Sequence, residues 1–227
     1  MLQKHLENPW FSRLWILQEI QLGTRSSIIK CGEHEITWAL FCRAILCIDG
    51  TRHGIPSELK ESISFITDTC LYIPSASLYE ILWCQVGREC ADDRDRIYGL
   101  LNLLPPILGA RLQVDYIKSQ REIFQSFTRT RMEQVQRLEL MRSCRLQENW
   151  RPSWVPNLGK GVAANVVPDA CGYLASGLSA AIIRTDATTD FLDVTAIRVG
   201  IIENVSEHKF TSLDDINEFI IEKGLQE

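Results

Sequence analysis

The sequence of 227 residues predicts an α+β protein that is mainly helical, with a short N-terminal hairpin and a small antiparallel sheet in the C-terminal third. Most of its apolar residues recur three and four positions apart, as they do on the buried faces of amphipathic helices. Two stretches, residues 26–37 and 180–204, instead carry β-type residues and indicate strands. Because 45% of the residues are hydrophobic, the chain has enough apolar material for a core.

The first expected element is a buried helix that begins at Asn8. Asn8 is a good N-cap, and Pro9 fits the first helical position because its missing N–H is not needed there. Apolar residues lie on nearly all sides of this helix, so it should be covered on more than one face. Gln18 falls within the main apolar arc and should have a specific hydrogen-bond partner, because an unpaired buried amide costs about 1–3 kcal/mol. The arc consists of Trp10, Phe11, Leu14, Trp15 and Leu22.

The next elements follow in order along the chain. Residues 26–31 and 34–37 predict a hairpin around Gly32, after which Thr37 caps a helix. Residues 49–56 contain two glycines and a proline, and they form a loop that is the best candidate domain boundary. Further helices are expected over residues 57–71 and 77–86, from Asp92 or Asp93 to Pro105, and from the capping box Ser119-x-x-Glu122 to about residue 140.

The C-terminal part is expected to be more irregular. Residues 143–178 are rich in Gly, Pro, Asn and Ser and indicate an extended connection. Two strands, residues 180–184 and 191–204, form the small antiparallel sheet, and a last helix spans residues 212–224. This organisation divides the chain into three regions, residues 1–48, 49–110 and 111–227.

The segment NPWFSRLWILQEI, followed by IIKCGEHEITW, resembles the last part of the fungal heterokaryon-incompatibility (HET) domain. That family shows a W-x-x-R-x-W-x-x-Q-E helix, then an apolar strand ending in Cys-Gly, then an Ile-x-Trp element. The residues that match this HET motif are Trp10, Arg13, Trp15, Gln18, Glu19, Cys31, Gly32, Ile36 and Trp38.

Two later segments, DDRDRIYGLLNLLP and RPSWVPNL, resemble segments that commonly follow the HET domain. We call the matching residues the post-domain motif: Asp93, Arg94, Asp95, Tyr98, Trp154 and Pro156. The family's earlier motifs, a Gly-Tyr-x-Trp-Gly segment and a Cys-Ile-Asn-Gln segment, have no counterpart here. The resemblance therefore implies that residues 1–48 are the C-terminal remnant of a HET domain and that the chain is truncated at its N-terminus. Residues 49–110 would be the helical region that follows the domain, and residues 111–227 a C-terminal α+β region.

The resemblance implies a function in non-self recognition and programmed cell death, through protein partners and with no cofactor. Because the earlier motifs are missing, we expect this chain to be inactive alone. Two alternatives stay open. HET domains have been compared at fold level with Toll/interleukin-receptor domains, some of which cleave NAD with a glutamate, and Glu19 would then be the catalytic carboxylate. The chain could instead be a scaffold that binds a partner through residues 111–227. The simpler interpretation of Gln18 and Glu19 is structural, because a catalytic carboxylate needs a formed pocket and a positioned partner.

Other patterns favour structural roles. The cluster Asp92-Asp93-Arg94-Asp95-Arg96 fits a helix start with internal charge pairing. The eight cysteines contain no C-x-x-C pair and the four histidines no pair four residues apart, so no metal site is expected. Six arginines lie between residues 129 and 151, but glutamates interrupt them, which favours a solvated face over a nucleic-acid surface.

Charge and hydropathy indicate the compartment. The net charge of −5 argues against general attraction to nucleic acid or to anionic membranes. The first residues contain no apolar signal region. The longest apolar run, residues 36–48, contains Arg43 and is too short to span a bilayer. We therefore expect a cytoplasmic protein with reduced cysteines and no membrane span.

Overall fold

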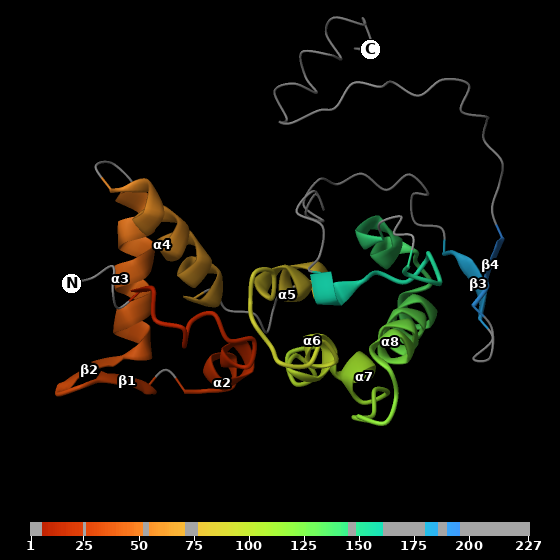
Figure 1. Cartoon of the computed structure of the whole chain (residues 1–227), viewed down its shortest axis with the longest axis horizontal. Coiled ribbons are helices and arrows are strands. Elements are labelled where there is room, and N and C mark those ends of the chain that lie inside the picture. Colours follow the sequence, from red (N-terminus) through yellow and green to blue (C-terminus); the bar gives the residue numbers. More distant parts are fainter. Residues whose placement is uncertain are drawn as a thin grey trace, which may run out of the picture. The chain divides into compact units, whose positions relative to one another are not determined.

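The computed structural model describes residues 6–24, 26–51, 55–70, 77–144, 149–160, 180–185 and 190–195 (Figure 1). The chain divides into two compact units, Met1–Thr195 and Ala196–Glu227, and all described residues belong to the first. The protein is α+β and mainly helical, with two small antiparallel sheets, as predicted. The predicted strand residues 196–204 and the predicted last helix lie outside the described residues. The division into three regions stays a prediction.

The elements follow one another in the expected order. The N-terminal part contains α2 (Ile16–Gln21), β1 (Ile28–Cys31), β2 (His34–Thr37), α3 (Trp38–Thr51) and α4 (Ser57–Cys70). It is followed by α5 (Leu78–Cys84), α6 (Asp95–Tyr98), α7 (Pro106–Gly109) and α8 (Gln120–Val135). Two 3-10 turns, η2 (Glu139–Ser143) and η3 (Leu158–Lys160), precede β3 (Ile182–Thr185) and β4 (Leu192–Thr195).

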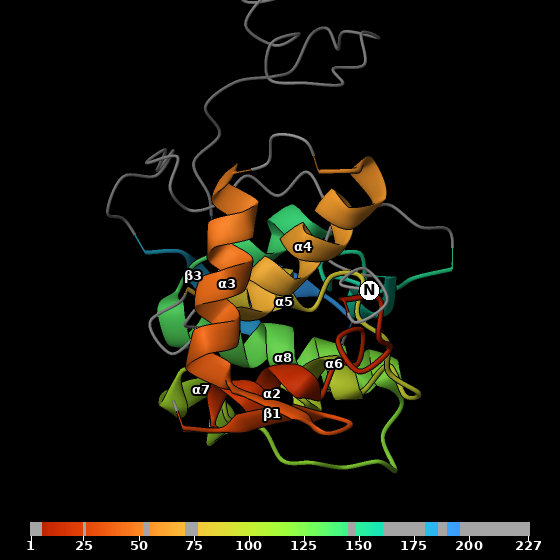
Figure 2. The ribbon, with the colours of Figure 1, turned by 90° about the vertical axis from the view of Figure 1, so that its left-hand side faces the viewer.

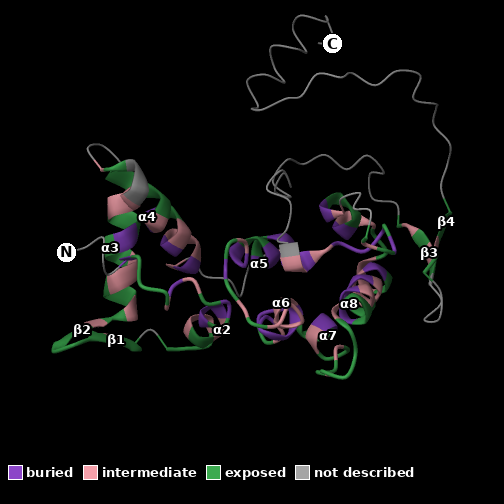
Figure 3. Cartoon of the chain, in the orientation of Figure 1, coloured by how far each residue is buried: buried purple, intermediate pink, exposed green. Residues whose placement is uncertain are grey.

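The N-terminal hairpin forms around Gly32 as predicted, with its first strand beginning at Ile28 rather than at residue 26. Strands β1 and β2 pair antiparallel, from Ile28 opposite Thr37 to Cys31 opposite His34. The two-residue turn contains Gly32, whose positive φ of 60° suits glycine because it has no Cβ. The Thr37 hydroxyl then accepts a hydrogen bond from the Leu40 amide, which caps α3 as expected. Both strands are largely exposed (Figure 3).

Two apolar clusters stabilise the fold. We call the larger one the central core; it is built from α5, α6, α7 and α8 together with Leu14, Leu17, Trp154, Val155 and Leu158. The smaller one, the N-terminal core, consists of Leu6, Phe11, Ile16, Ile45, Ile63 and Ile66, and lies where α3 packs against α4 (Figure 1, Figure 2). Residues 11–17 contribute to both clusters and therefore join them.

The predicted helix from Asn8 onward is wrong in its first half. Residues 9–15 form successive turns, and the helix begins only at Ile16. The reason is a parallel bridge between Arg13 and Glu89. In this bridge the Leu14 amide donates to the Glu89 carbonyl at 2.9 Å, and the Glu89 amide donates to the Ser12 carbonyl at 2.7 Å. These backbone groups are the ones that a continuous helix would need for its own hydrogen bonds.

Burial of this segment is also only partly as predicted. Leu14 is fully buried, but Trp15, which was expected in the buried arc, is 36% exposed. Gln18 is half-buried, and its side chain forms no hydrogen bond with another described residue, so the expected amide partner is not seen within the described ranges. The neighbouring Gln21 donates from its amide to the Thr69 carbonyl at 3.1 Å and ties α2 to α4.

Arg88 binds the backbone of the segment of turns formed by residues 9–15. It is 2% exposed, and its guanidinium donates to the Phe11 carbonyl at 2.7 Å, the Cys84 carbonyl at 2.6 Å and the Thr69 hydroxyl at 2.6 Å. It also lies over the Phe65 ring, 4.5 Å from the ring centre. Burial lowers the pKa of Arg88 to about 10, so the side chain stays charged at neutral pH. One buried cation thus joins α4, α5 and the segment that links the two cores.

Capping boxes begin two helices. Ser119 and Glu122 satisfy each other's backbone amides at the start of α8, as predicted, and Ser77 and Glu80 do the same for α5. Helix α8 was expected to reach about residue 140 but ends at Val135, because Gln136 takes a left-handed conformation with φ 49°.

The residues that follow α8 turn back onto it. Arg131 forms an ion pair of 2.6 Å with Glu139 in the 3-10 turn η2. Val135 and Leu138 are half-buried, because the chain leaves the helix between them. Pro106, expected to stop a helix, instead begins α7, since proline suits a first helical position.

Candidate functional site

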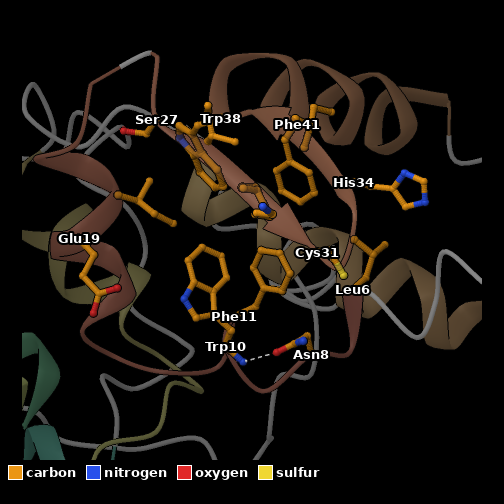
Figure 4. A pocket seen from close by; sticks show the side chains of 15 residues that line it. Leu6, Asn8, Trp10, Phe11, Glu19, Ser27, Cys31, His34, Trp38 and Phe41 are labelled. Atoms are coloured by element: carbon orange, nitrogen blue, oxygen red, sulfur yellow. Dashed lines mark hydrogen bonds between the residues drawn. The ribbon is translucent and has the colours of Figure 1, made fainter.

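An apolar groove lies between residues 6–20, the β1–β2 hairpin and the start of α3 (Figure 4). Its volume is about 710 Å³, within the range of about 300–1,000 Å³ typical of ligand pockets. The apolar side chains that line it are Leu6, Trp10, Phe11, Ile20, Ile28, Ile29, Ile36, Trp38 and Phe41. Polar lining residues are fewer: Asn8, Glu19, Ser27, Lys30 and His34, with Cys31 beside them.

Four aromatic rings form a continuous series in this groove. Trp10 meets Phe11 edge to face at 5.0 Å between ring centres, and Phe11 stacks on Phe41 at 5.7 Å. Phe41 in turn stacks on Trp38 at 5.4 Å. Figure 4 shows Trp10 and Phe11 on one side, facing Trp38 and Phe41 on the other. The local turn that presents Trp10 is fixed by Asn8, whose side-chain oxygen accepts a hydrogen bond from the Trp10 amide at 2.9 Å.

The structure brings only part of the HET motif together. Trp10, Glu19, Cys31 and Trp38 line the groove, and Ile36 lines it with them. The other members of the motif are not among its lining residues: Arg13, Trp15, Gln18 and Gly32. The groove members come from α2, β1, β2, α3 and the turns that precede α2, so this gathering depends on the tertiary fold.

Glu19 lies at the edge of the groove and not in its interior. Its carboxylate faces Arg13 across 3.8 Å, and the side chains are 51% and 55% exposed. An exposed pair of this kind contributes little to stability, roughly 0–1 kcal/mol. The groove interior beside Glu19 is formed by aromatic and aliphatic side chains, which suit apolar contacts rather than proton transfer.

The two motifs meet outside the groove. The Trp15 indole donates to one carboxylate oxygen of Asp95 at 3.3 Å, and the Tyr116 hydroxyl donates to the other at 2.6 Å. This second bond, more than burial, raises the pKa of Tyr116 to about 12. Next to them, Gly99 lies so close to the Asp95 carbonyl that an added Cβ would be 2.9 Å from its oxygen. The exposed tryptophan therefore has a polar partner from the post-domain motif.

Arg94 holds a loop in place. Its guanidinium binds the Asp92 carboxylate at 2.6 Å and donates to the carbonyls of Tyr116 and Lys118 at 2.6 and 2.9 Å. The side-chain hydrogen bond from Arg94 holds the pKa of Asp92 below its usual value. The Tyr98 hydroxyl exchanges two hydrogen bonds with the Asp115 backbone. The Asp92–Arg94 pair shows the internal charge pairing that the sequence predicted for this cluster.

Gly159, which directly follows the segment RPSWVPNL, contacts the first segment of the post-domain motif. Gly159 lies so close to the Asp93 carboxylate that an added Cβ would be 2.7 Å from its oxygen. Trp154 is buried against the central core, and its indole donates to the Asp190 carbonyl at 2.8 Å. Pro156 is buried as well.

Sequence reasoning missed Arg88 and Gln85. Gln85 is fully buried, and neither polar atom of its amide has a partner among the described residues. Arginine and glutamine are rarely buried, and no local spacing pattern marks such positions. Only the packing of α4, α5 and residues 11–17 shows what Arg88 does.

Comparison with protein-family models, curated proteins and solved structures gives no match for this chain. Within the described residues, no group of three or more histidine, cysteine or acidic side chains could hold a metal ion. No helix in the described ranges is both long and apolar enough to cross a membrane. Free cysteines in the described part of the chain are Cys31, Cys42, Cys47, Cys70, Cys84, Cys90 and Cys144.

Proposed function

We propose that this chain is part of a heterokaryon-incompatibility signalling protein and acts in non-self recognition and cell death through protein contacts. The observation that supports this proposal is the groove, where Trp10, Cys31 and Trp38 of the HET motif lie around one apolar surface. Rare residue types that match a family pattern and also share one surface favour a common role over separate structural ones.

The chemistry of the groove favours a polypeptide occupant with apolar side chains. Its walls carry four aromatic rings, and tryptophan side chains are enriched where proteins bind one another. In the HET family the preceding motifs include an aromatic Gly-Tyr-x-Trp-Gly segment. We propose that a HET polypeptide of this type fills the groove, and that the chain without it is inactive.

Expression in a fungal host tests the proposal. The chain alone should leave cells viable, and coexpression with a HET-domain polypeptide that carries the earlier motifs should arrest growth. Death caused by the chain alone would contradict the proposal.

A direct binding measurement with purified proteins adds a matched control. Ile28 begins β1, lines the groove and is 58% exposed, and Ile182 begins β3, away from the groove, and is 59% exposed. Ile28→Lys should weaken binding at least tenfold by placing a charge in the apolar surface, and Ile182→Lys should leave it unchanged. Equal effects of the two variants would refute the groove as the contact.

One observation favours the enzymatic alternative: Glu19 lines the groove. If the chain hydrolyses NAD, purified protein incubated with NAD should release nicotinamide, and Glu19→Gln should abolish the release. No release, or equal release by the variant, would remove this alternative.

The scaffold alternative is supported by exposed apolar side chains within residues 111–227, among them Ile117 and Phe191. A partner captured by the whole chain should then also bind a chain that carries Ile28→Lys. Loss of that partner in the Ile28→Lys variant would place binding in the groove instead.

A further inference from the structure

The β1–β2 hairpin has one edge that no other strand pairs with in the described part of the chain. The Trp38 amide donates to the Ser27 carbonyl at 2.7 Å, which places a hydrogen-bonded pair at the open end of the hairpin. Hydrogen-bonded and non-hydrogen-bonded pairs alternate along an antiparallel ladder, so Ile28 and Lys30 direct their backbone N–H and C=O groups away from β2. On that side, neither residue forms a backbone hydrogen bond with another described residue.

The groove follows this free edge of β1. One face of the hairpin lines it throughout, with the side chains of Ser27, Ile29, Cys31, His34, Ile36 and Trp38. From the opposite face only Ile28 and Lys30 take part, whereas their partners on β2, Thr37 and Glu35, are not among the lining residues. Successive residues of a strand point to opposite faces, so a groove that includes consecutive residues of β1 must reach around its edge. The unpaired backbone groups of Ile28 and Lys30 therefore border the groove.

We propose that the groove binds an extended polypeptide segment of another protein, which adds to β1 as a third strand. Its backbone pairs with Ile28 and Lys30 at about 4.8 Å from β1, and every second side chain packs beside Ile29 against the aromatic rings. A compact ligand leaves the outward amides and carbonyls of β1 without partners, whereas an extended backbone satisfies them. This inference rests on the proposed function, which places a polypeptide in the groove.

The residues along the edge indicate which sequence fits. Lys30 is exposed and forms no ion pair with any other described residue, so an acidic side chain opposite it on the added strand complements its charge. The positions before and after that acidic residue face Ile29 and the aromatic rings, where apolar side chains fit. The segment therefore alternates apolar and polar residues and carries an acidic residue among the polar ones.

Titration calorimetry of the full chain with a synthetic peptide tests this mode of binding. The probe is acetyl-Thr-Val-Thr-Val-Asp-Val-Thr-amide, and two further versions carry N-methyl groups on one or the other set of alternate amides. N-methylation removes a donor and adds bulk, so the set that faces β1 should weaken binding about tenfold or more, and the other set should change it by less than about twofold. Equal effects of the two sets, or binding of the unmodified peptide weaker than about 1 mM, would overturn the inference.

Variants of Lys30 test the same contact from the side of the protein. Lys30→Pro removes an amide that points away from β2, so the hairpin keeps its own hydrogen bonds, and an edge strand tolerates proline. Lys30→Ala is the matched control, because it removes the charge and keeps the amide. We expect Lys30→Pro to weaken peptide binding about tenfold and Lys30→Ala only about two- to threefold. Equal affinities of the two variants, both folded by circular dichroism, would refute the backbone pairing; the methylated peptides test it on the unchanged chain.

Two comparisons separate this inference from its alternatives. A dimer seen by sedimentation that Lys30→Pro dissociates would show a second copy on this edge and would overturn the choice of a separate polypeptide. If a HET polypeptide binds and Lys30→Pro leaves its affinity unchanged, strand addition is wrong while the proposed function stands. If the peptide binds through β1 and the HET polypeptide does not bind, the proposed function is wrong while strand addition stands.

Discussion

Replacing Arg88 by methionine should destabilise the protein more than any surface arginine change. The methionine keeps much of the apolar volume but removes the hydrogen bonds to the Phe11 carbonyl and the Thr69 hydroxyl, which join elements far apart in the sequence. A hydrogen bond to a charged group contributes about 1.5–3 kcal/mol, so the loss of two gives about 3–6 kcal/mol. Part of this loss is offset, because folding of the variant does not bury a charged side chain. We therefore expect the free energy of unfolding to fall by about 2–4 kcal/mol.

Urea-induced unfolding followed by tryptophan fluorescence measures this loss. Arg13→Met is the control, because Arg13 is exposed and contacts only one exposed carboxylate at 3.8 Å, so its replacement should cost less than about 1 kcal/mol. If Arg88→Met costs no more than Arg13→Met, the argument that Arg88 joins the two cores is wrong. In Arg88→Met the Phe11 carbonyl loses its hydrogen bond to the guanidinium, so the structure of residues 8–15 should change. If the variant loses the expected stability but residues 8–15 keep their native structure, the argument is also contradicted.

Three further outcomes are expected. Leu14→Ala should cost about 3–5 kcal/mol because the side chain is fully buried, whereas Trp15→Ala should cost only about 1–2 kcal/mol; a reversed order in urea unfolding would contradict the observed burial. Ser119→Ala should cost about 1 kcal/mol by removing the cap of α8, measurable by thermal unfolding followed by circular dichroism. The folded pKa of Tyr116, about 12, lies above its unfolded value of 10, so the stabilisation by its bond to Asp95 is complete below pH 10 and is lost as the pH rises towards 12. An absorbance titration should show a tyrosine ionising near pH 12 that disappears in Tyr116→Phe, and an unchanged titration would rule this out.

Several parts of the fold were predictable because their signals are local. The turn at Gly32 and the cap at Ser119 depend on residues within a few positions of each other, and each has the expected structure.

For the candidate site, the sequence identified residues but not their arrangement in space. Residues of the HET motif could be named, but which of them share a surface depends on how the hairpin and α3 lie against residues 6–20. Trp10 and Trp38 come together in the groove, while Trp15, only five residues from Trp10, turns away and binds Asp95. A helical wheel had placed Trp10 and Trp15 on one arc, which holds only if the segment between them is a helix.

The sequence by itself determined the mainly helical α+β class, the hairpin and the capped helices, because these follow from hydrogen bonds and apolar spacing between near neighbours. Only the tertiary structure decided the course of residues 8–15, since the Arg13–Glu89 bridge and the bond from Arg88 to the Phe11 carbonyl connect residues more than seventy positions apart. Such bonds compete directly with the helical hydrogen bonds of the same backbone groups, and they prevail here because the segment must supply side chains to two cores at once.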